Sequence, residues 1–314
     1  PPAAAEKKVL FSMEWVIYAE HAAFFVAKEL GYYSKAGIDV DIQRGHGSDD
    51  LVKKMATGRP PFGLPDVGEV IKGRAKGMGV RTVAILIDRS IYVVLALESS
   101  GIREPKDLVG KTMGDLPSSS SRRMFPAVAN SAGFDASKVK WITVIPPAKI
   151  SSLVAGKVDA VTTYENVLPP AIAAARSVGK KIHVIPYRNW GVDIYSNGIA
   201  TTDEMIQKDP DLVRRFVGAS VRGIAWAADH PKETVDILLK HNPALNRKLS
   251  LETWEIMRGY VRHQAEKGPG IALMTRKKMG HTRDLISKYF GLKRVVPLDQ
   301  IFTNEFVPKV SLKK

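Results

Sequence analysis

Apolar runs and amphipathic segments alternate along the first two thirds of the chain. Short apolar or alternating segments predict strands, and they fall at 9–12, 38–42, 62–64, 80–87, 92–97, 111–114, 139–144, 160–163 and 182–185. Segments with apolar residues at helical spacing lie between them, at 22–30, 49–57, 67–76, 124–131, 149–154 and 168–178. Such alternation is typical of α/β layers with mostly parallel sheets.

The last third of the chain has a different pattern. Four helical patterns follow one another at 212–229, 232–240, 251–266 and 277–289, with Pro231 near a helix start, where proline is favourable. A chain of 314 residues is long enough for about two domains. The helix-rich end therefore suggests that the chain returns to its first lobe and packs against it.

Composition narrows the classes of function. The chain has no Cys, which excludes disulfides, thiolate zinc sites, iron–sulfur clusters and cysteine nucleophiles. Its net charge of +15 would suit nucleic acid, a membrane surface or an anionic ligand. The basic residues are spread along the chain without interleaved aromatic residues, so we expect a basic surface and no nucleic-acid partner. No apolar run approaches the roughly 18 residues of a membrane span, so we expect no membrane insertion.

The sequence begins Pro1-Pro2-Ala3-Ala4-Ala5-Glu6, without an initiator methionine. We interpret this as a trimmed or processed start, which either a cleaved export signal or a cloning choice would leave.

The search for catalytic motifs is negative. The dinucleotide and phosphate-loop glycine motifs, His-Glu-x-x-His and Gly-x-Ser-x-Gly are all missing. His21 and His46 lie near Glu20 and Asp49, but their spacing does not predict a metal cluster. We therefore expect no metal, no cofactor and no catalytic residue.

The segment from Glu14 to His21 is the first candidate ligand loop. Trp15, Tyr18 and His21 lie there between a predicted strand and a predicted helix, together with two carboxylates. Aromatic faces beside hydrogen-bonding groups suit a flat heterocycle. Packing in the core or at a lobe edge is the alternative.

Two further loops carry small polar groups. Gly45–Asp49 allows close backbone approach, and Ser48 is a plausible helix N-cap. Pro117–Arg122 offers hydroxyls and a guanidinium at a predicted helix start, which would suit a carboxylate, sulfonate or phosphate; its candidate contacts are Ser118, Ser119, Ser120 and Arg122. An ordinary turn and a solvated surface loop are the alternatives.

A fourth loop follows the apolar strand that ends at Val161. Open α/β sheets bind ligands at the carboxyl ends of their strands, and Tyr164 and Glu165 lie at such an end. Trp190 and Asp193 are candidates for a further wall from the connection between lobes, with core packing as the alternative for Trp190.

Several stretches, in this order, resemble one family. Trp15 and His21 precede 26–40; then come Gly47-Ser48-Asp49, 105–111, 153–160, 195–199 and 210–217. Their order and spacing are similar to the periplasmic substrate-binding proteins of ABC importers in the thiamine-pyrimidine, taurine, alkanesulfonate and nitrate group. Glu14-Trp15 followed by His21 looks closest to the thiamine-pyrimidine branch, although residues 16–20 differ from that branch's Asn/Pro-rich stretch.

This resemblance implies an α/β, two-lobed periplasmic binding protein fold of type II. Each lobe would be a mixed sheet flanked by helices, with a ligand cleft between the lobes. Lobe I would comprise 1–93 and 197–314, and lobe II 94–196. The chain would cross between lobes near 90–96 and 193–199.

The resulting hypothesis is an exported, periplasmic and monomeric protein that captures a small organic solute for an ABC permease. Trp15, Tyr18 and Tyr164 would stack on the solute, a thiamine-pyrimidine-like heterocycle. Its polar edge would meet Glu165, Asp66 and His21, and an acidic or carbonyl end would meet Ser48 and 118–122.

Other classes of function stay open. They are binding of a sulfonate or aromatic acid, a soluble enzyme of pyrimidine or aromatic metabolism on the same fold, and a ligand sensor without a transport role. The related eukaryotic pyrimidine synthases share the fold and use a Cys-rich iron motif, and the lack of Cys argues against that chemistry here.

Overall fold

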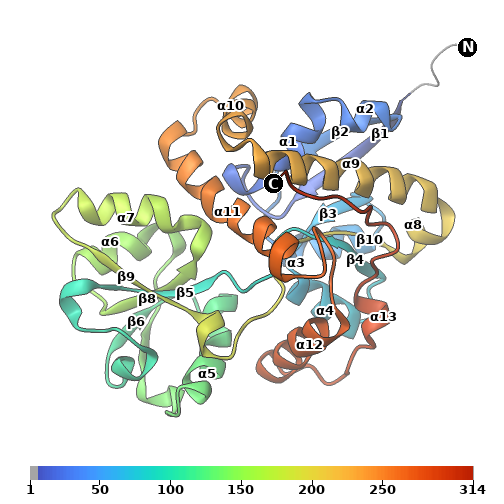
Figure 1. Ribbon diagram of the computed structural model, residues 1–314. Helices are drawn as coiled ribbons and strands as arrows, with labels where there is room; N and C mark the ends of the chain where they lie inside the picture. Colours follow the sequence, from blue (N-terminus) through green and yellow to red (C-terminus); the bar gives the residue numbers. More distant parts are fainter. Residues whose placement is uncertain (1–5, 314) are drawn as a thin grey trace, which may run out of the picture. The chain divides into compact units, whose positions relative to one another are not determined.

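The computed structural model describes residues 6–313 and divides the chain into two compact units (Figure 1). Unit 1 comprises the chain up to Asp88, Tyr195–Ser287 and the chain from Leu292 onward. Unit 2 comprises Arg89–Ile194 and Lys288–Gly291. The chain therefore enters unit 2 at 88/89, before the first strand of that unit begins, and returns to unit 1 at 194/195. The end of one C-terminal helix also belongs to unit 2.

Unit 1 contains a five-stranded mixed sheet in the order β2-β1-β3-β10-β4. Its strands are β1 (Lys7–Met13), β2 (Ile38–Gln43), β3 (Phe62–Leu64), β4 (Val80–Ile85) and β10 (Gly198–Thr202). β1 runs parallel to β2 and β3, whereas β10 runs antiparallel to β3 and β4. The sequence pattern did not predict β10, and its direction makes the sheet mixed.

Helices cover this sheet. In chain order they are α1 (Ala22–Glu29), α2 (Tyr32–Lys35), α3 (Ser48–Ala56), α4 (Val67–Ala75), α8 (Asp203–Lys208), α9 (Pro210–Asp229), α10 (Pro231–His241), α11 (Arg247–Lys267), α12 (Arg276–Phe290) and α13 (Leu298–Ile301). The four long C-terminal helices predicted from the sequence are confirmed. They belong to unit 1, apart from the end of α12.

Aromatic packing fixes one face of the unit 1 sheet. Phe216 of α9 stacks on Phe62 of β3 with ring centroids 4.0 Å apart, and it meets the edge of Phe11 of β1 at 5.1 Å. Phe11 and Phe62 are register partners, so one helix residue holds two neighbouring strands. On the other face, α3 packs its Leu51 and Met55 against Gly63 of β3. Because side chains pack on both faces of the sheet here, the positions of the ends of β1 and β3 are fixed.

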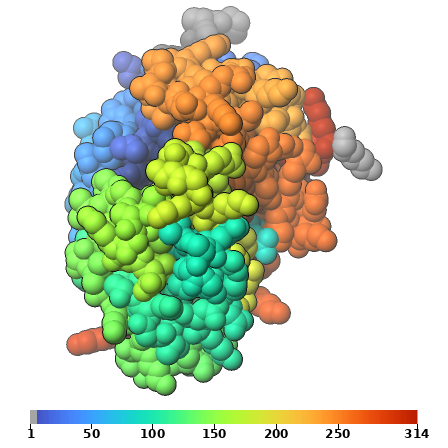
Figure 2. All heavy atoms as spheres, turned by 90° about the vertical axis from the view of Figure 1, so that its left-hand side faces the viewer, coloured from blue at the N-terminus to red at the C-terminus, as the bar shows by residue number. Residues whose placement is uncertain are grey.

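Unit 2 contains a second mixed sheet in the order β7-β6-β8-β5-β9. Its strands are β5 (Tyr92–Leu97), β6 (Thr112–Gly114), β7 (Lys140–Ile142), β8 (Ala160–Tyr164) and β9 (Ile182–Pro186). β6 runs parallel to β7 and β8, and β5 runs antiparallel to β8 and β9. The flanking helices are α5 (Ser120–Ser131), α6 (Lys149–Val154) and α7 (Leu168–Arg176). Residues 89–194 of unit 2 form the teal to yellow-green part of the chain in Figure 2.

Short 3₁₀ turns connect several elements. They lie at Ala19–His21, Glu98–Ser100, Pro105–Leu108, Ala136–Lys138, Pro146–Ala148, Glu165–Val167 and Tyr187–Trp190. Within residues 6–313, no helix has the length and apolar character needed to cross a lipid bilayer.

Two predicted helix starts were wrong. α3 begins at Ser48 with Gly47 as its N-cap, so Ser48 is not the cap. α5 begins at Ser120 rather than at 124, so Ser120 and Arg122 lie in its first turn rather than in a loop. Ser residues are weak helix formers, and their partners in the fold, described below, extend the helix.

Candidate functional site

Polar loops meet at one edge of the unit 1 sheet. β1, β2 and β3 end there, and the antiparallel strand β10 begins there. Glu14, Gly45–Ser48, Asp66 and Ser196 therefore share what we call the carboxyl edge of unit 1. A β-bridge between Asp66 and Asn197 joins two of these segments. Ligands of open α/β sheets bind at edges of this kind.

Trp15 projects from this edge on a fixed backbone. The Gly45 N–H donates to the Trp15 carbonyl (3.0 Å) and the Gly47 N–H to the Glu14 carbonyl (2.6 Å). A Cβ at Gly45 would lie 2.1 Å from the Met13 carbonyl oxygen, so only glycine allows the two loops to meet. The Trp15 side chain is nonetheless 50% exposed. The edge thus presents an indole whose position is fixed by its neighbours.

Next to Trp15, a buried carboxylate–imidazole pair lies beneath the loop surface. His21 is fully buried, and its Nε2 lies 3.1 and 3.2 Å from the two oxygens of Glu14. The Tyr18 N–H donates to His21 Nδ1 (3.3 Å), and the Tyr18 hydroxyl donates to Glu20 (2.5 Å). Since Nδ1 accepts, the ring proton of neutral His21 is on Nε2 and is donated to Glu14.

The charges around His21 shift its titration. Burial lowers the pKa of the imidazole. The negative charges of Glu14 and Glu20, together with the hydrogen bond to Glu14, outweigh burial and raise the pKa above 6.5. Protonation would give Nδ1 a hydrogen that faces the Tyr18 N–H. The geometry of the Tyr18 turn therefore matches the neutral ring.

Glu14, Glu20 and His21 also form a cluster whose ligand atoms all lie within 4.8 Å of one another. The sequence spacing did not predict this cluster, because the turn at 18–21 brings Glu14 next to a residue seven positions away. A metal-bound histidine normally donates its second ring N–H to an acceptor. Here the second nitrogen, Nδ1, faces the N–H donor of Tyr18. The cluster therefore fits a metal ion poorly.

Asp66 and its neighbours form the second polar group of this edge. The Asp66 N–H donates to the Ser48 hydroxyl (3.1 Å), and the Asp66 carboxyl accepts from the Gly68 N–H (2.8 Å) and the Ser196 hydroxyl (3.1 Å). Burial, followed by the charge of Glu69, raises the pKa of Asp66 to about 7. Near neutral pH this carboxyl can therefore donate or accept a hydrogen bond.

The matching edge of unit 2 is organised by Asp115, which directly follows β6. Asp115 is completely buried and pairs with Lys149 at 2.6 Å. Its second oxygen accepts from the hydroxyls of Thr162 (2.5 Å) and Ser121 (3.0 Å). One carboxylate thus joins β6, β8, α5 and α6. Neither Asp115 nor Lys149 was predicted from the sequence, although a lone Asp directly after a short strand was a usable signal.

This network also positions the serine-rich segment. Arg122 donates to the Asp115 carbonyl (3.0 Å) and lies over the Trp141 ring at 4.7 Å. Ser119 is the N-cap of α5 but makes no side-chain cap bond; its hydroxyl lies 2.9 Å from that of Ser121. Ser118 is exposed, and Ser119 and Ser120 are partly exposed. Ser118–Ser120 are therefore the accessible part of this edge.

The other predicted residues of unit 2 lie on β8 and on the returning chain. Tyr164 is partly buried and meets the edge of the Tyr92 ring at 5.6 Å. Glu165 is buried and pairs with Arg188 at 2.5 Å. Trp190 and Asp193 are partly buried, in and just after the 3₁₀ turn Tyr187–Trp190.

The predicted residues thus form one group in each unit. The carboxyl edge of unit 1 brings together Trp15, Tyr18, His21, Ser48 and Asp66. In unit 2, Ser118–Ser120, Arg122, Tyr164 and Glu165 lie near the carboxyl ends of β6 and β8.

A profile of the family described as NMT1/THI5 like matches residues 18–234. The chain belongs to the NMT1/THI5-like family. The matched segment includes all the predicted ligand-binding residues from Tyr18 to Asp193 and leaves out Trp15, which lies just before it.

Several NMT1/THI5-like relatives have names that state a ligand or a reaction. The formylaminopyrimidine-binding protein of Halalkalibacterium halodurans is 27% identical over 77% of this chain and 73% of its own length. The riboflavin-binding protein RibY of Chloroflexus aurantiacus is 25% identical over 96% of this chain and 86% of its own length. A 4-amino-5-hydroxymethyl-2-methylpyrimidine phosphate synthase of Legionella pneumophila is 23% identical over 78% and 77%. The relatives thus include binding proteins and enzymes.

Solved structures share the fold. The periplasmic aliphatic sulphonate binding protein SsuA of Escherichia coli matches with a TM-score of 0.75 at 14% identity, over 99% of this chain and 96% of that one. The two-lobed α/β fold predicted from the sequence, with a mixed sheet in each lobe, is confirmed.

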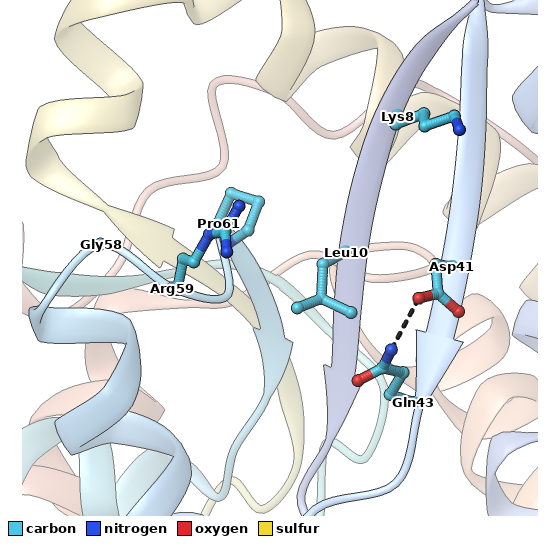
Figure 3. A pocket seen from close by; sticks show the side chains of 7 residues that line it. All are labelled: Lys8, Leu10, Asp41, Gln43, Gly58, Arg59 and Pro61. Atoms are coloured by element: carbon cyan, nitrogen blue, oxygen red, sulfur yellow. Dashed lines mark hydrogen bonds between the residues drawn. The ribbon is translucent and has the colours of Figure 1, made fainter.

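Two surface depressions lie elsewhere on this NMT1/THI5-like chain. One, of about 350 Å³, opens beside β1 and β2 (Figure 3) and is lined by Lys8, Leu10, Asp41, Gln43, Gly58, Arg59 and Pro61. Another, of about 300 Å³, is lined by Arg74, Gly77, Met78, Arg81, Asp203, Arg294 and Gln300. None of the residues that line them was predicted to bind ligand.

Proposed function

We propose that this protein captures a small nitrogen heterocycle, of the aminopyrimidine or flavin type, and delivers it unchanged to an ABC permease. The half-exposed Trp15 carries this proposal, because its backbone is fixed beside the buried Glu14–His21 pair. An aromatic face in a preorganised position binds a flat ring without the cost of ordering a side chain.

Each group at the two edges has an assigned part. Trp15, Tyr18 and Tyr164 stack on the ring, and Asp66 bonds its polar edge, since a carboxyl with a pKa of about 7 can donate to a ring nitrogen or accept from an amino group. His21 is fully buried and therefore acts through Glu14, which it positions. Ser48 and the exposed part of 118–122 bond a carbonyl or acidic end, and Glu165, Trp190 and Asp193 complete the wall from unit 2.

The relatives support the class of ligand. The names of two of them state formylaminopyrimidine and riboflavin, both nitrogen heterocycles with polar edges. The fold is that of periplasmic binding proteins, which supports export and a permease partner. Arg122, the anion-binding group predicted from the sequence, is bonded to the Asp115 carbonyl and stacked on Trp141, so it does not by itself favour a sulfonate.

The test is a ligand screen of the purified protein by thermal shift and tryptophan fluorescence. The panel holds formylamino- and hydroxymethyl-pyrimidines, riboflavin, taurine, alkanesulfonates, nitrate and aromatic acids. Binding to the native state must raise its stability, by about 2.7 kcal/mol at a ligand concentration one hundred times Kd. Saturable stabilisation by a heterocycle that is recovered unmodified supports the proposal, and stabilisation only by a sulfonate contradicts it.

An enzyme of pyrimidine metabolism is the second candidate, since a relative bears a synthase name. Chromatography of the same incubations separates the two functions. A new product that accumulates beyond one equivalent of protein would favour an enzyme, whereas quantitative recovery of the ligand favours a binding protein.

A further inference from the structure

Arg89, at the point where the chain enters unit 2, has no bonding partner among the described residues. It is partly buried, and its Nε is shielded from solvent without an acceptor. No hydrogen bond or ion pair joins its guanidinium to another residue within 6–313. A guanidinium keeps its charge throughout the physiological pH range, and removing a charge from water without a partner is unfavourable.

The other cations at the carboxyl edge of unit 2 contrast with Arg89. Lys149 pairs with Asp115, and Arg188 pairs with Glu165. Arg122 donates to a carbonyl and lies over Trp141. Because Asp115 and Glu165 already have cationic partners, neither carboxylate neutralises the positive charge of Arg89.

Backbone hydrogen bonds hold the chain on either side of Arg89, each within its own unit. Two residues before it, Ile87 exchanges hydrogen bonds with Ser196 and Asn197 at the carboxyl edge of unit 1. Two residues after it, the Ile91 carbonyl accepts from the Glu165 N–H (2.8 Å), where β5 starts beside the end of β8. β6 lies on the other side of β8, so the start of β5 and the end of β6 lie on the same edge, two strand spacings (about 10 Å) apart across the sheet.

We infer that Arg89 binds an oxyanion carried by the ligand, and that the ligand is therefore an anionic heterocycle such as a phosphate ester or a carboxylate. This inference rests on the proposed function, because it concerns the same ligand. A guanidinium offers two parallel N–H groups to a phosphate or carboxylate, which makes such contacts strong and specific.

The experiment compares matched ligands by isothermal titration calorimetry. The probes are riboflavin and its 5′-phosphate, 4-amino-5-hydroxymethyl-2-methylpyrimidine and its phosphate, and inorganic phosphate alone. The proteins are wild type, R89Q, R89K and R103Q; Arg103 is an exposed arginine beyond the other end of β5 and serves as the matched control. Circular dichroism and thermal unfolding establish that each variant is folded.

We expect wild type and R103Q to bind one phosphorylated heterocycle at least tenfold more tightly than its neutral form. R89Q should lose that preference while its affinity for the neutral form stays within twofold, and R89K should keep part of the preference. A preference that survives R89Q, a wild type that binds only the neutral form, or inorganic phosphate that binds as tightly without displacing the heterocycle would each overturn the inference. If wild type binds none of the heterocycles, the proposed function fails as well, which is a distinct result.

Discussion

At the residue scale, the exposed position of Trp15 means that its removal should affect ligand affinity and protein stability differently. Its side chain is 50% exposed, so its removal should change the free energy of unfolding by no more than about 0.5 kcal/mol. A ligand ring that stacks on the indole would lose about 1–3 kcal/mol of binding free energy when the indole is removed. This loss corresponds to a roughly 5- to 150-fold weaker affinity. W15A should therefore lose affinity and keep its stability, as measured by calorimetry and urea unfolding.

Two controls make the Trp15 prediction specific. W15F keeps a flat face and should keep part of the affinity. V295A removes another exposed apolar side chain, 66% exposed and outside the candidate site, and should bind as wild type does. Equal affinity of W15A and wild type would remove Trp15 from the site.

Asp66 gives a pH-dependent prediction. Its pKa is about 7 in the folded chain and about 3.9 in an unfolded one. Between these values the unfolded state binds fewer protons, so the free energy of unfolding falls as pH rises from 4 to 7 and then levels off. D66N lacks this titration, so the stability of wild type relative to D66N should fall between pH 5 and pH 7.5.

The control for this effect is D49N. The hydrogen bond from Lys53 lowers the pKa of Asp49, so its contribution has the opposite sign and disappears only at acid pH. Urea unfolding at each pH measures all three proteins. A constant difference between wild type and D66N across pH 5–7.5 would contradict the raised pKa.

At the element scale, the Asp115–Lys149 pair holds the carboxyl edge of unit 2 together. Both side chains are at most 5% exposed. D115N would keep hydrogen bonds to Thr162 and Ser121 but leave the Lys149 ammonium buried without its counter-charge. Removing one partner of a buried pair costs about 3–5 kcal/mol, so D115N should lose that much stability in urea unfolding.

The double variant D115N/K149M distinguishes loss of the pair from a general loss of packing. Removing both charges is often much less costly than removing one, so the double variant should be more stable than D115N alone. If the two losses simply add, the ion pair is not the organising interaction of this edge.

The same network shows why the sequence predicted some elements and missed others. Apolar segments such as 92–97 and the four C-terminal helices were predictable, because their own pattern encodes their burial. β10 was missed because Gly198–Thr202 has little apolar character, and its strand conformation depends on β3 and β4 on either side. The start of α5 was misplaced because Ser121, in its first turn, donates to the buried carboxylate of Asp115 from another segment, and Ser119 bonds to Ser121.

The candidate site was predictable to a similar degree. Trp15, Ser48 and Asp66 could be proposed as candidates because they follow predicted strands, and whether they bind a ligand stays a prediction. Arg89, Asp115 and Lys149 were missed because what distinguishes them is the presence or lack of a partner distant in sequence, which a linear pattern does not contain. The cluster of Glu14 with His21 was hidden for the same reason.

At the scale of the whole molecule, charge and surface argue for a monomer. A net charge of +15 opposes association of identical chains. A stable dimer buries about 1,600 Å² around an apolar core. The large apolar side chains that are exposed among the described residues come from separate segments: Trp15 and Val16, Val109, Ile142 and Ile145, Ile172 and Val178, and Val295. Trp15 is the residue proposed above to stack on the ligand.

Sedimentation equilibrium should therefore give a mass near 34.5 kDa at micromolar protein, with and without ligand. Raising the salt concentration screens the repulsion between chains, so a monomer that depends on charge alone would begin to associate at 0.5 M salt. We expect no such change, because the exposed large apolar side chains are few and come from separate segments, which does not favour a large apolar patch even when repulsion is screened. A mass near twice this value at any salt concentration would contradict the prediction, and association only in high salt would locate the cause in net charge rather than in the distribution of apolar surface.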